Sequence, residues 1–281
     1  MERQPFDDIR ALIGELKPAD EAARTAALAR LAQVAPAGSL GALEPIVGWI
    51  AAWRGSPVLH RPIIALYAGA HAGQGDVAAT RQTMEAIAAG GAPVSRAAQH
   101  LGAGLDVFDL AIDRPVGDGR SGPKMSEREC AATMAFGMEA LAKQPDLVIL
   151  GAFGQGVDAS AAALAQALAA GVDDPLEVLR QVGGRETAAI CGAILAAANQ
   201  RVPVLLDGPA AIAAAAVLHA LTPDAIAHCR VGQAGPDPAL RRALERLNLA
   251  SLFDLGVTLE DGTGSTVALS LIKLACALSV D

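Results

Sequence analysis

The sequence predicts an open α/β fold, in which a mostly parallel β-sheet carries helices on both faces and the two ends of the chain form a small helical domain. From about Arg61 onward, short runs rich in β-forming residues alternate with alanine-rich helical stretches. Strands that alternate with helices in this way are typical of βαβ units. Some of the runs, such as Val202–Leu206, are continuously apolar, as expected for strands of a parallel sheet buried on both sides.

The N-terminal part, Phe6–Trp53, is predicted to be helical. Apolar residues recur there at helical spacing, and Pro36–Ser39 interrupts the pattern. Ser39 suits the N-cap of a second helix that runs from Leu40 to Trp53. The apolar positions of the first helical stretch are Leu12, Leu16, Ala23, Ala27, Leu31 and Val34.

The rest of the chain alternates between predicted strands and helices. The strands are Pro62–Ala68, Leu105–Ile112, Asp146–Leu150, Val202–Leu206, Ala227–Val231 and Leu252–Leu255. The helices are Val77–Ala89, Ser126–Lys143, Ala159–Ala170, Pro175–Val182, Glu186–Asn199, Pro209–Leu221, Pro238–Leu247 and Ser265–Leu278. We therefore expect a small helical domain from residues 1–60 together with 265–281, and an α/β domain from residues 61–264.

Composition and charge exclude several classes of protein. The formal net charge is −8, and no dense run of lysine and arginine occurs, which argues against a nucleic-acid-binding protein. The longest apolar run, Pro209–Ala220, is too short to span a bilayer, and Met1–Arg10 does not resemble a signal peptide. The cysteines are widely spaced, so we expect reduced thiols in a cytoplasmic protein and no metal site. They are Cys130, Cys191, Cys229 and Cys276.

Polar or turn-forming residues follow several predicted strands, at the positions where ligands bind in open α/β sheets. These segments include Gly69–Gly73 with His71, the glycine segment Gly151–Gly156, and Asp207–Gly208. Glycines allow a backbone to approach a ligand, and the N–H groups at a helix start attract anions. Glycines also serve tight packing alone, and a histidine after a strand is often a structural residue. The residues by themselves leave both interpretations open.

A further such segment, Leu259–Ser265, lies near the C-terminus. Glu260 and Asp261 precede a Gly-Thr-Gly-Ser turn that opens an amphipathic helix. A carboxylate on a loop at a strand end can act as a general base. The same residues also fit a solvated turn in which Thr263 or Ser265 caps the helix.

Taken together and in order, these segments resemble the nicotinate-nucleotide:dimethylbenzimidazole phosphoribosyltransferase family over nearly the whole chain. No single motif is decisive, but their collinear order is specific. Pro36–Glu44 is similar to the family's P-G-S-L-G-R-L-E, and Gly122–Ser126 to its G-P-A-M-T/S. Further matches are Gly90–Val94, Asp174–Leu179, Val182–Glu186, Pro203–Gly208, and Asp254–Gly256 through Gly262–Gly264.

The resemblance implies a Rossmann-like fold, a homodimer and a reaction without a cofactor. The implied reaction transfers phosphoribose from nicotinate mononucleotide to 5,6-dimethylbenzimidazole or a related base. It yields α-ribazole phosphate and nicotinate. Asp261 falls on the family's catalytic glutamate and is the expected base. The expected substrate-binding residues are His71, Gly154, Gly156, Asp158, Gly183, Gly184, Asp207, Gly208, Leu259 and Gly262.

The chain departs from the family pattern within the glycine segment. The family's G-E-M-G-I-G-N-T-T corresponds to G-A-F-G-Q-G-V-D-A, so that the glutamate becomes Ala152 and the Asn-Thr pair becomes Val157 and Asp158. We expect Asp158 to stand at the helix N-cap, to occupy the free N–H groups and to repel a phosphate.

Other departures are a shorter carboxylate and two shortened segments. Asp261 is one methylene shorter than the family's glutamate. Gly171–Pro175 runs almost directly into the next helix, where the family has an Arg/Lys-rich segment with a phosphate-contacting lysine. Gly75–Ala79 replaces a stretch that encloses the aromatic base.

Two functional hypotheses therefore remain from the sequence. The first is an active phosphoribosyltransferase in the assembly of the cobalamin nucleotide loop. The second is a catalytically degenerate paralogue that acts as a regulatory subunit, as the heterodimer partner of an active copy, or as a small-molecule binder.

Overall fold

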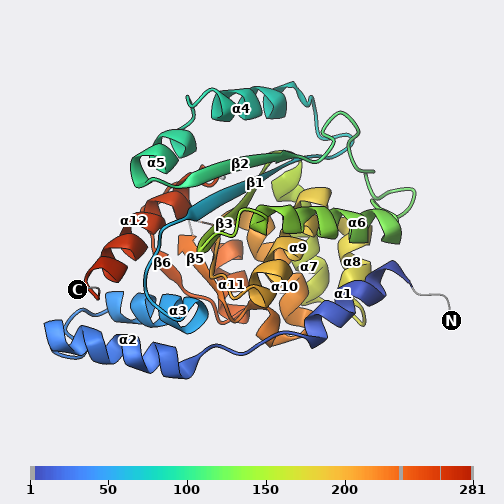
Figure 1. Cartoon of the computed structure of the whole chain (residues 1–281). Helices are drawn as coiled ribbons and strands as arrows, with labels where there is room; N and C mark the ends of the chain where they lie inside the picture. Colours follow the sequence, from blue (N-terminus) through green and yellow to red (C-terminus); the bar gives the residue numbers. More distant parts are fainter. Residues whose placement is uncertain (1–3, 234–236, 260, 280–281) are drawn as a thin grey trace.

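The computed structural model describes residues 4–233, 237–259 and 261–279 and contains a six-stranded sheet (Figure 1). The strand order is β2-β1-β3-β4-β5-β6, and each neighbouring pair is parallel. The prediction of a parallel sheet with helices on both faces is confirmed. The strands are β1 (Pro62–Ala70), β2 (Gly104–Asp109), β3 (Leu147–Gln155), β4 (Val204–Leu206), β5 (Cys229–Gln233) and β6 (Ser251–Phe253).

The predicted strands around residues 146–150 and 202–206 are the central strands β3 and β4. All nine residues of β1 and all three of β4 are buried, which explains their continuous apolar sequences. The edge strand β2 is only partly buried. It ends at Asp109, three residues before the predicted end, because the Asp109 carboxylate accepts a hydrogen bond from the backbone N–H of Ile112 (3.0 Å) and turns the chain.

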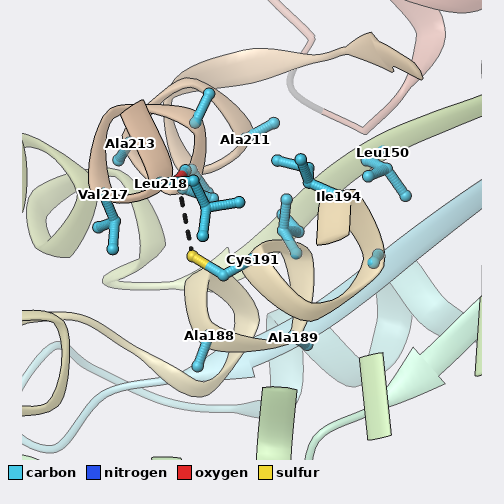
Figure 2. Packing of buried hydrophobic residues seen from close by; sticks show 14 of the residues in the cluster. Leu150, Ala188, Ala189, Cys191, Ile194, Ala211, Ala213, Val217 and Leu218 are labelled. Atoms are coloured by element: carbon cyan, nitrogen blue, oxygen red, sulfur yellow. Dashed lines mark hydrogen bonds between the residues drawn. The ribbon is translucent and has the colours of Figure 1, made fainter. Parts of the chain in front are cut away.

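One face of the sheet, called the α9 face below, is covered mainly by the alanine-rich helices in the middle of the chain. Tyr67, Leu150 and Leu206 point into this layer. Figure 2 shows how the small side chains of two of these helices allow close packing, with the Cys191 thiol 3.6 Å from the carbonyl oxygen of Ala214. The helices are α1 (Pro5–Gly14), α6 (Glu127–Gly137), α7 (Val157–Ala169), α8 (Pro175–Val182), α9 (Arg185–Asn199), α10 (Gly208–Leu221) and α11 (Pro238–Arg246).

The opposite face, called the α12 face, is covered by helices from both ends of the chain and from the β1–β2 connection. Leu66, Ile149 and Leu205 point into this layer. The helices are α2 (Glu21–Val34), α3 (Leu43–Arg54), α4 (Ala78–Ala88), α5 (Pro93–Leu101) and α12 (Thr263–Ala277).

The N-terminal helices divide between the two faces. α2 and α3 pack with α12, as expected for a helical unit formed by the two ends of the chain. α1 packs instead on the α9 face, where Phe6 is buried and its N–H donates to Glu127 of α6. The division into domains at residue 60 stays a prediction.

Three local predictions need correction. Ser39 does not cap a helix, because residues 37–42 form turns and α3 begins only at Leu43, after Ala42. The sequence analysis missed α5, a short helix that starts with Pro93 at its first position. The predicted helix Ser126–Lys143 is α6 followed by the 3₁₀ turn Met138–Leu141.

Candidate functional site

The predicted site residues gather at one edge of the sheet, where β1, β3 and β4 end. These strands are adjacent and parallel, so their carboxyl ends meet. His71 directly follows β1, and its backbone N–H donates to the carbonyl oxygen of Gln155 at the end of β3 (3.1 Å). Asp207 directly follows β4. The edge therefore carries two groups of polar residues, one on each face.

The first group lies on the α9 face and consists of Lys124, His71, Glu186 and Ser160. His71 is buried, and its Nε2 lies 3.1 Å from Oε1 of Glu186, which is fully buried. The Lys124 ammonium lies 3.4 Å from Nδ1 of His71 and donates to the Ser160 hydroxyl (3.2 Å). An ammonium can only donate, so we assign Nδ1 as the acceptor of this hydrogen bond and the Nε2–H as the donor to Glu186.

Glycines around this group make room for the Glu186 carboxylate. A Cβ on Gly184 would lie 2.0 Å from Oε1 of Glu186, and a Cβ on Gly69 would lie 2.4 Å from Oε2. A Cβ on Gly183 would lie 2.6 Å from the Leu179 carbonyl oxygen. Gly183 and Gly184 therefore serve close packing, and the structure places neither of them beside the second polar group described below.

The glycine segment differs from its predicted form, because β3 continues through it to Gln155. Gly154, at φ +131°, lies in the strand, where a Cβ would collide with the carbonyl oxygen of Gly69. Gly156, at φ +77°, ends the strand and packs against His71. α7 then begins at Val157 without a side-chain cap.

This start of α7 corrects the prediction for Asp158. Asp158 is the second residue of the helix rather than its N-cap, and the structure records no capping bond from its side chain. Its carboxylate is exposed. The charge still opposes an anion at the helix start, but it does not occupy the N–H groups.

The second group lies on the α12 face and is organised by the buried carboxylate of Asp207. Its two oxygens accept hydrogen bonds from the backbone N–H groups of Gly262 (2.9 Å) and Ser265 (2.7 Å) at the start of α12. The Ser265 hydroxyl donates to the carbonyl oxygen of Leu206 (3.0 Å). Burial raises the pKa of Asp207, and the hydrogen bonds from Ser265 and Gly262 oppose that increase.

Asp261 lies next to these two hydrogen bonds from Gly262 and Ser265 to Asp207, which are called the Asp207 clamp below. Its Oδ1 accepts a hydrogen bond from the backbone N–H of Thr263 (3.1 Å), and its negative charge contributes to the raised pKa of Asp207. Gly262 has φ +86°, and a Cβ there would lie 2.9 Å from Leu66 in β1. The loop that carries Asp261 is therefore fixed to both β4 and β1.

The remaining predicted residues have clear positions. Gly208, at φ +77°, is the first residue of α10. Leu259 has 49% of its surface exposed and projects from the loop before α12. Glu260, the neighbouring carboxylate in the sequence, lies outside the described residues.

A pocket of about 400 Å³ opens beside the end of β3. The Thr80 hydroxyl oxygen accepts a hydrogen bond from the Gln155 N–H (3.1 Å) at this position, and Oε1 of Gln155 is buried without a partner. Phe153 supplies an aromatic surface. The pocket is lined by Gln74, Gly75, Asp76, Ala79, Thr80, Thr83, Phe153, Gly154 and Gln155.

Sequence reasoning missed Lys124, Glu186 and Ser160 as site residues, and it missed Gln74, Thr80 and Thr83 of the pocket. Glu186 had a signal in the sequence, because a glutamate two residues after Gly184, in the first turn of a long apolar helix, requires a polar partner. Ser160, Thr80 and Thr83 had none, since their neighbours come from distant parts of the chain.

The described part of the chain contains no group of three or more histidine, cysteine, aspartate or glutamate residues suited to holding a metal ion. No helix there is long and apolar enough to cross a membrane.

Comparisons with known proteins agree with this arrangement. A family model described as "Phosphoribosyltransferase" matches residues 16–172 and 164–281. The chain is 42% identical to the nicotinate-nucleotide–dimethylbenzimidazole phosphoribosyltransferase of Rhizobium leguminosarum bv. trifolii, over 97% of this chain and 93% of that protein. It is also 42% identical to the enzyme of the same name from Agrobacterium fabrum, over 97% and 92%.

A solved structure extends the similarity to the fold. It is the crystal structure of nicotinate-nucleotide–dimethylbenzimidazole phosphoribosyltransferase from Thermus thermophilus. It superposes with a TM-score of 0.83 at 26% sequence identity and covers 92% of this chain and 96% of that one.

Proposed function

The chain belongs to this phosphoribosyltransferase family, and from that membership we propose that it transfers the phosphoribosyl group of nicotinate mononucleotide to 5,6-dimethylbenzimidazole. The products are α-ribazole phosphate and nicotinate, and the reaction belongs to the assembly of the lower ligand of cobalamin. Full-length relatives with this activity in their names support the assignment.

The reaction needs a base and an anion site. One nitrogen of the benzimidazole attacks the anomeric carbon of the ribose, and a new C–N bond forms as the bond to nicotinate breaks. Nicotinate leaves with the electron pair of that bond. The other nitrogen of the benzimidazole then carries a surplus proton, which a carboxylate must accept.

We assign the role of base to Asp261. The observation that carries this assignment is the clamp at the start of α12, in which Asp207 binds the N–H groups of Gly262 and Ser265 and so fixes the loop that bears Asp261. A fixed carboxylate at the carboxyl edge of a parallel sheet suits proton abstraction from a bound substrate. In this proposal Asp207 is a positioning residue and does not itself touch the reacting atoms.

Two neighbouring features suit the phosphate of the nucleotide and the aromatic ring of a substrate. The unoccupied N–H groups at the start of α7, next to Gly156, favour the phosphate. The pocket beside β3, with Phe153 in its wall, suits a planar aromatic ring. We propose that Gly183 and Gly184 act on the site through packing and His71 through its polar contacts with Glu186 and Lys124, whereas Leu259 and Gly208 border it.

The test is to incubate the protein with both substrates and to detect α-ribazole phosphate by mass spectrometry. Asp261→Asn keeps the acceptor for the Thr263 N–H and removes the base, so turnover should fall roughly 10²- to 10⁴-fold. Asp261→Glu should retain a larger part of the activity. The control is Asp224→Asn, an exposed carboxylate in the 3₁₀ turn before β5, at the opposite edge of the sheet. Unchanged turnover in Asp261→Asn would remove Asp261 from the mechanism.

A second candidate function is a non-catalytic partner or small-molecule binder. Its support is the negative charge of Asp158 in the first turn of α7, where the phosphate would bind. Under this alternative the wild-type protein forms no α-ribazole phosphate alone and gains activity only with an active paralogue. The incubation described above, with and without such a paralogue, separates the two candidates.

We further propose that the chain forms a homodimer and acts in the cytoplasm. Two-fold homodimers are the commonest assemblies of soluble proteins. A monomer mass in light scattering at micromolar concentration would contradict the homodimer. A heterodimer with an active paralogue belongs to the second candidate function.

A further inference from the structure

Lys124 carries a positive charge that its immediate neighbours do not neutralise. Among the described residues, no carboxylate lies within 4.0 Å of its ammonium, and the partners that the structure records are the His71 ring and the Ser160 hydroxyl. The Glu186 carboxylate influences Lys124 only from behind the imidazole, which lies between them. Burial lowers the pKa of Lys124, and Glu186 opposes that decrease.

The geometry of the ammonium leaves one donor available. An ammonium has three N–H bonds, and the described contacts use two of them, toward Nδ1 of His71 and Oγ of Ser160. Ser160 is not free to turn toward another acceptor, because its hydroxyl donates to the carbonyl oxygen of Val182 (3.0 Å). The side chain of Lys124 is only partly buried, and its two described contacts leave the third N–H for a ligand.

The surroundings of Lys124 favour an anion. Ser160 belongs to the first turn of α7, whose start has no side-chain cap. Gly156, directly before α7, packs against His71, since a Cβ there would lie 2.9 Å from the His71 Cβ. The ammonium thus lies at the positive end of a helix, an unfavourable position for a cation unless an anion binds between them.

We propose that Lys124 is the cationic residue that binds the phosphate group of the mononucleotide substrate, together with the backbone N–H groups at the start of α7. The inference rests on the proposed function for the identity of the nucleotide. His71 and Glu186 are then positioning residues, because His71 holds Lys124 at the helix start and Glu186 holds His71. Lys124 stands where the family motif quoted above has alanine.

The test measures binding by calorimetry for three compounds that separate phosphate from carboxylate recognition. Nicotinate mononucleotide carries both groups, nicotinamide mononucleotide lacks the carboxylate, and nicotinate riboside lacks the phosphate. Lys124→Met removes the charge and keeps the length of the side chain. We expect the affinity for both nucleotides to fall roughly 10- to 100-fold and the affinity for the riboside to stay within about threefold.

Two further variants complete the design. Lys124→Arg should restore most of the nucleotide affinity, because it restores the charge. Lys143→Met is the matched control, since Lys143 is an exposed lysine paired with Asp106 on the edge strand β2, and it should bind all three compounds as the wild type does. In steady-state assays, Lys124→Met should raise KM for the nucleotide more than it lowers kcat.

Several outcomes would overturn the inference. The first is that Lys124→Met binds nicotinate mononucleotide within about twofold of the wild-type affinity. The second is that Lys124→Met loses as much affinity for the riboside as for the nucleotides. The third is that it loses affinity only for the compounds that carry the carboxylate. If the wild type makes α-ribazole phosphate and Lys124→Met shows one of these results, only the inference fails. If the wild type binds neither nucleotide and forms no product, the proposed function fails as well.

Discussion

Replacing Gly184 by alanine should displace the buried carboxylate of Glu186. The new Cβ would lie 2.0 Å from Oε1 and 2.4 Å from Oε2 of that carboxylate, distances that real contacts do not reach. Gly184 has φ −116° and ψ 171°, a conformation that alanine adopts without strain. The effect of the substitution is therefore steric, and it acts on a carboxylate that is enclosed by protein on every side.

The expected loss of stability is about 2–5 kcal/mol. Overpacking of a filled interior costs about 1–3 kcal/mol. Displacing Glu186 also breaks its hydrogen bond with His71, and a bond to a charged group contributes about 1.5–3 kcal/mol. A gain of about 0.4–1 kcal/mol opposes these losses, because alanine restricts the unfolded chain more than glycine does.

Urea unfolding followed by circular dichroism measures this difference. Gly91→Ala is the control, because a Cβ there would meet nothing closer than the carbonyl oxygen of Ala86 at 3.6 Å, and its unfolding free energy should stay within about 1 kcal/mol of the wild-type value. Nucleotide binding should weaken in Gly184→Ala, since His71 loses the partner that orients it. A free energy of unfolding within about 1 kcal/mol of the wild type would refute the reasoning.

Three other perturbations have expected outcomes. Gly192→Ala should lower the free energy of unfolding by about 1–3 kcal/mol in urea titrations, because its Cβ would lie 1.8 Å from the carbonyl oxygen of Met134 and must push α6 from α9; equal stability would contradict this close crossing. Burial lowers the pKa of His228 from 6.5 to about 4, so the folded protein binds fewer protons than the unfolded chain between these values. Stability should fall by roughly 3 kcal/mol as pH decreases through this window. His228→Gln should flatten the pH dependence, and an unchanged slope between pH 6.5 and about 4 would contradict the assignment. Asp158→Asn should tighten nicotinate mononucleotide binding roughly 2- to 5-fold in calorimetry, because it removes an exposed negative charge from the first turn of α7, and an unchanged Kd would show that the phosphate binds elsewhere.

The sequence was sufficient for the order of the strands and of most helices, because buried parallel strands and amphipathic helices leave local patterns, whereas the short helix α5 was missed. The residues at which these elements begin and end were harder to predict. β3 continues through the glycine segment to Gln155 because Gly154 packs directly on the backbone of β1 at Gly69. α7 consequently begins with a buried valine, Val157, so a polar residue at that position would be costly. Nothing in the local sequence encodes that contact.

The polar contacts of the site were the least predictable part. Asp207 was expected to bind substrate, yet its carboxylate binds backbone N–H groups more than fifty residues away, at Gly262 and Ser265. Lys124 belongs to the motif Gly122–Ser126, which predicts only a loop and a helix start and gives no indication of a site residue. Such contacts depend on which chain segments meet at the sheet edge, and that information belongs to the tertiary structure.

The glycines at the sheet edge explain how two buried carboxylates, Glu186 and Asp207, can lie so close to the strands β1 and β3. On the α9 face, the missing Cβ of Gly69 leaves space for Glu186. On the α12 face, a Cβ on Gly151 would lie 3.2 Å from Leu66 and 3.5 Å from the Cβ of Asp207, so that glycine brings the strand against the clamp. These glycines therefore leave the space that Glu186 and Asp207 need, and these two carboxylates in turn position Lys124 and Asp261. For this reason substitutions at the strand glycines should lower stability and substrate binding together, whereas substitutions at Lys124 and Asp261 should separate the two.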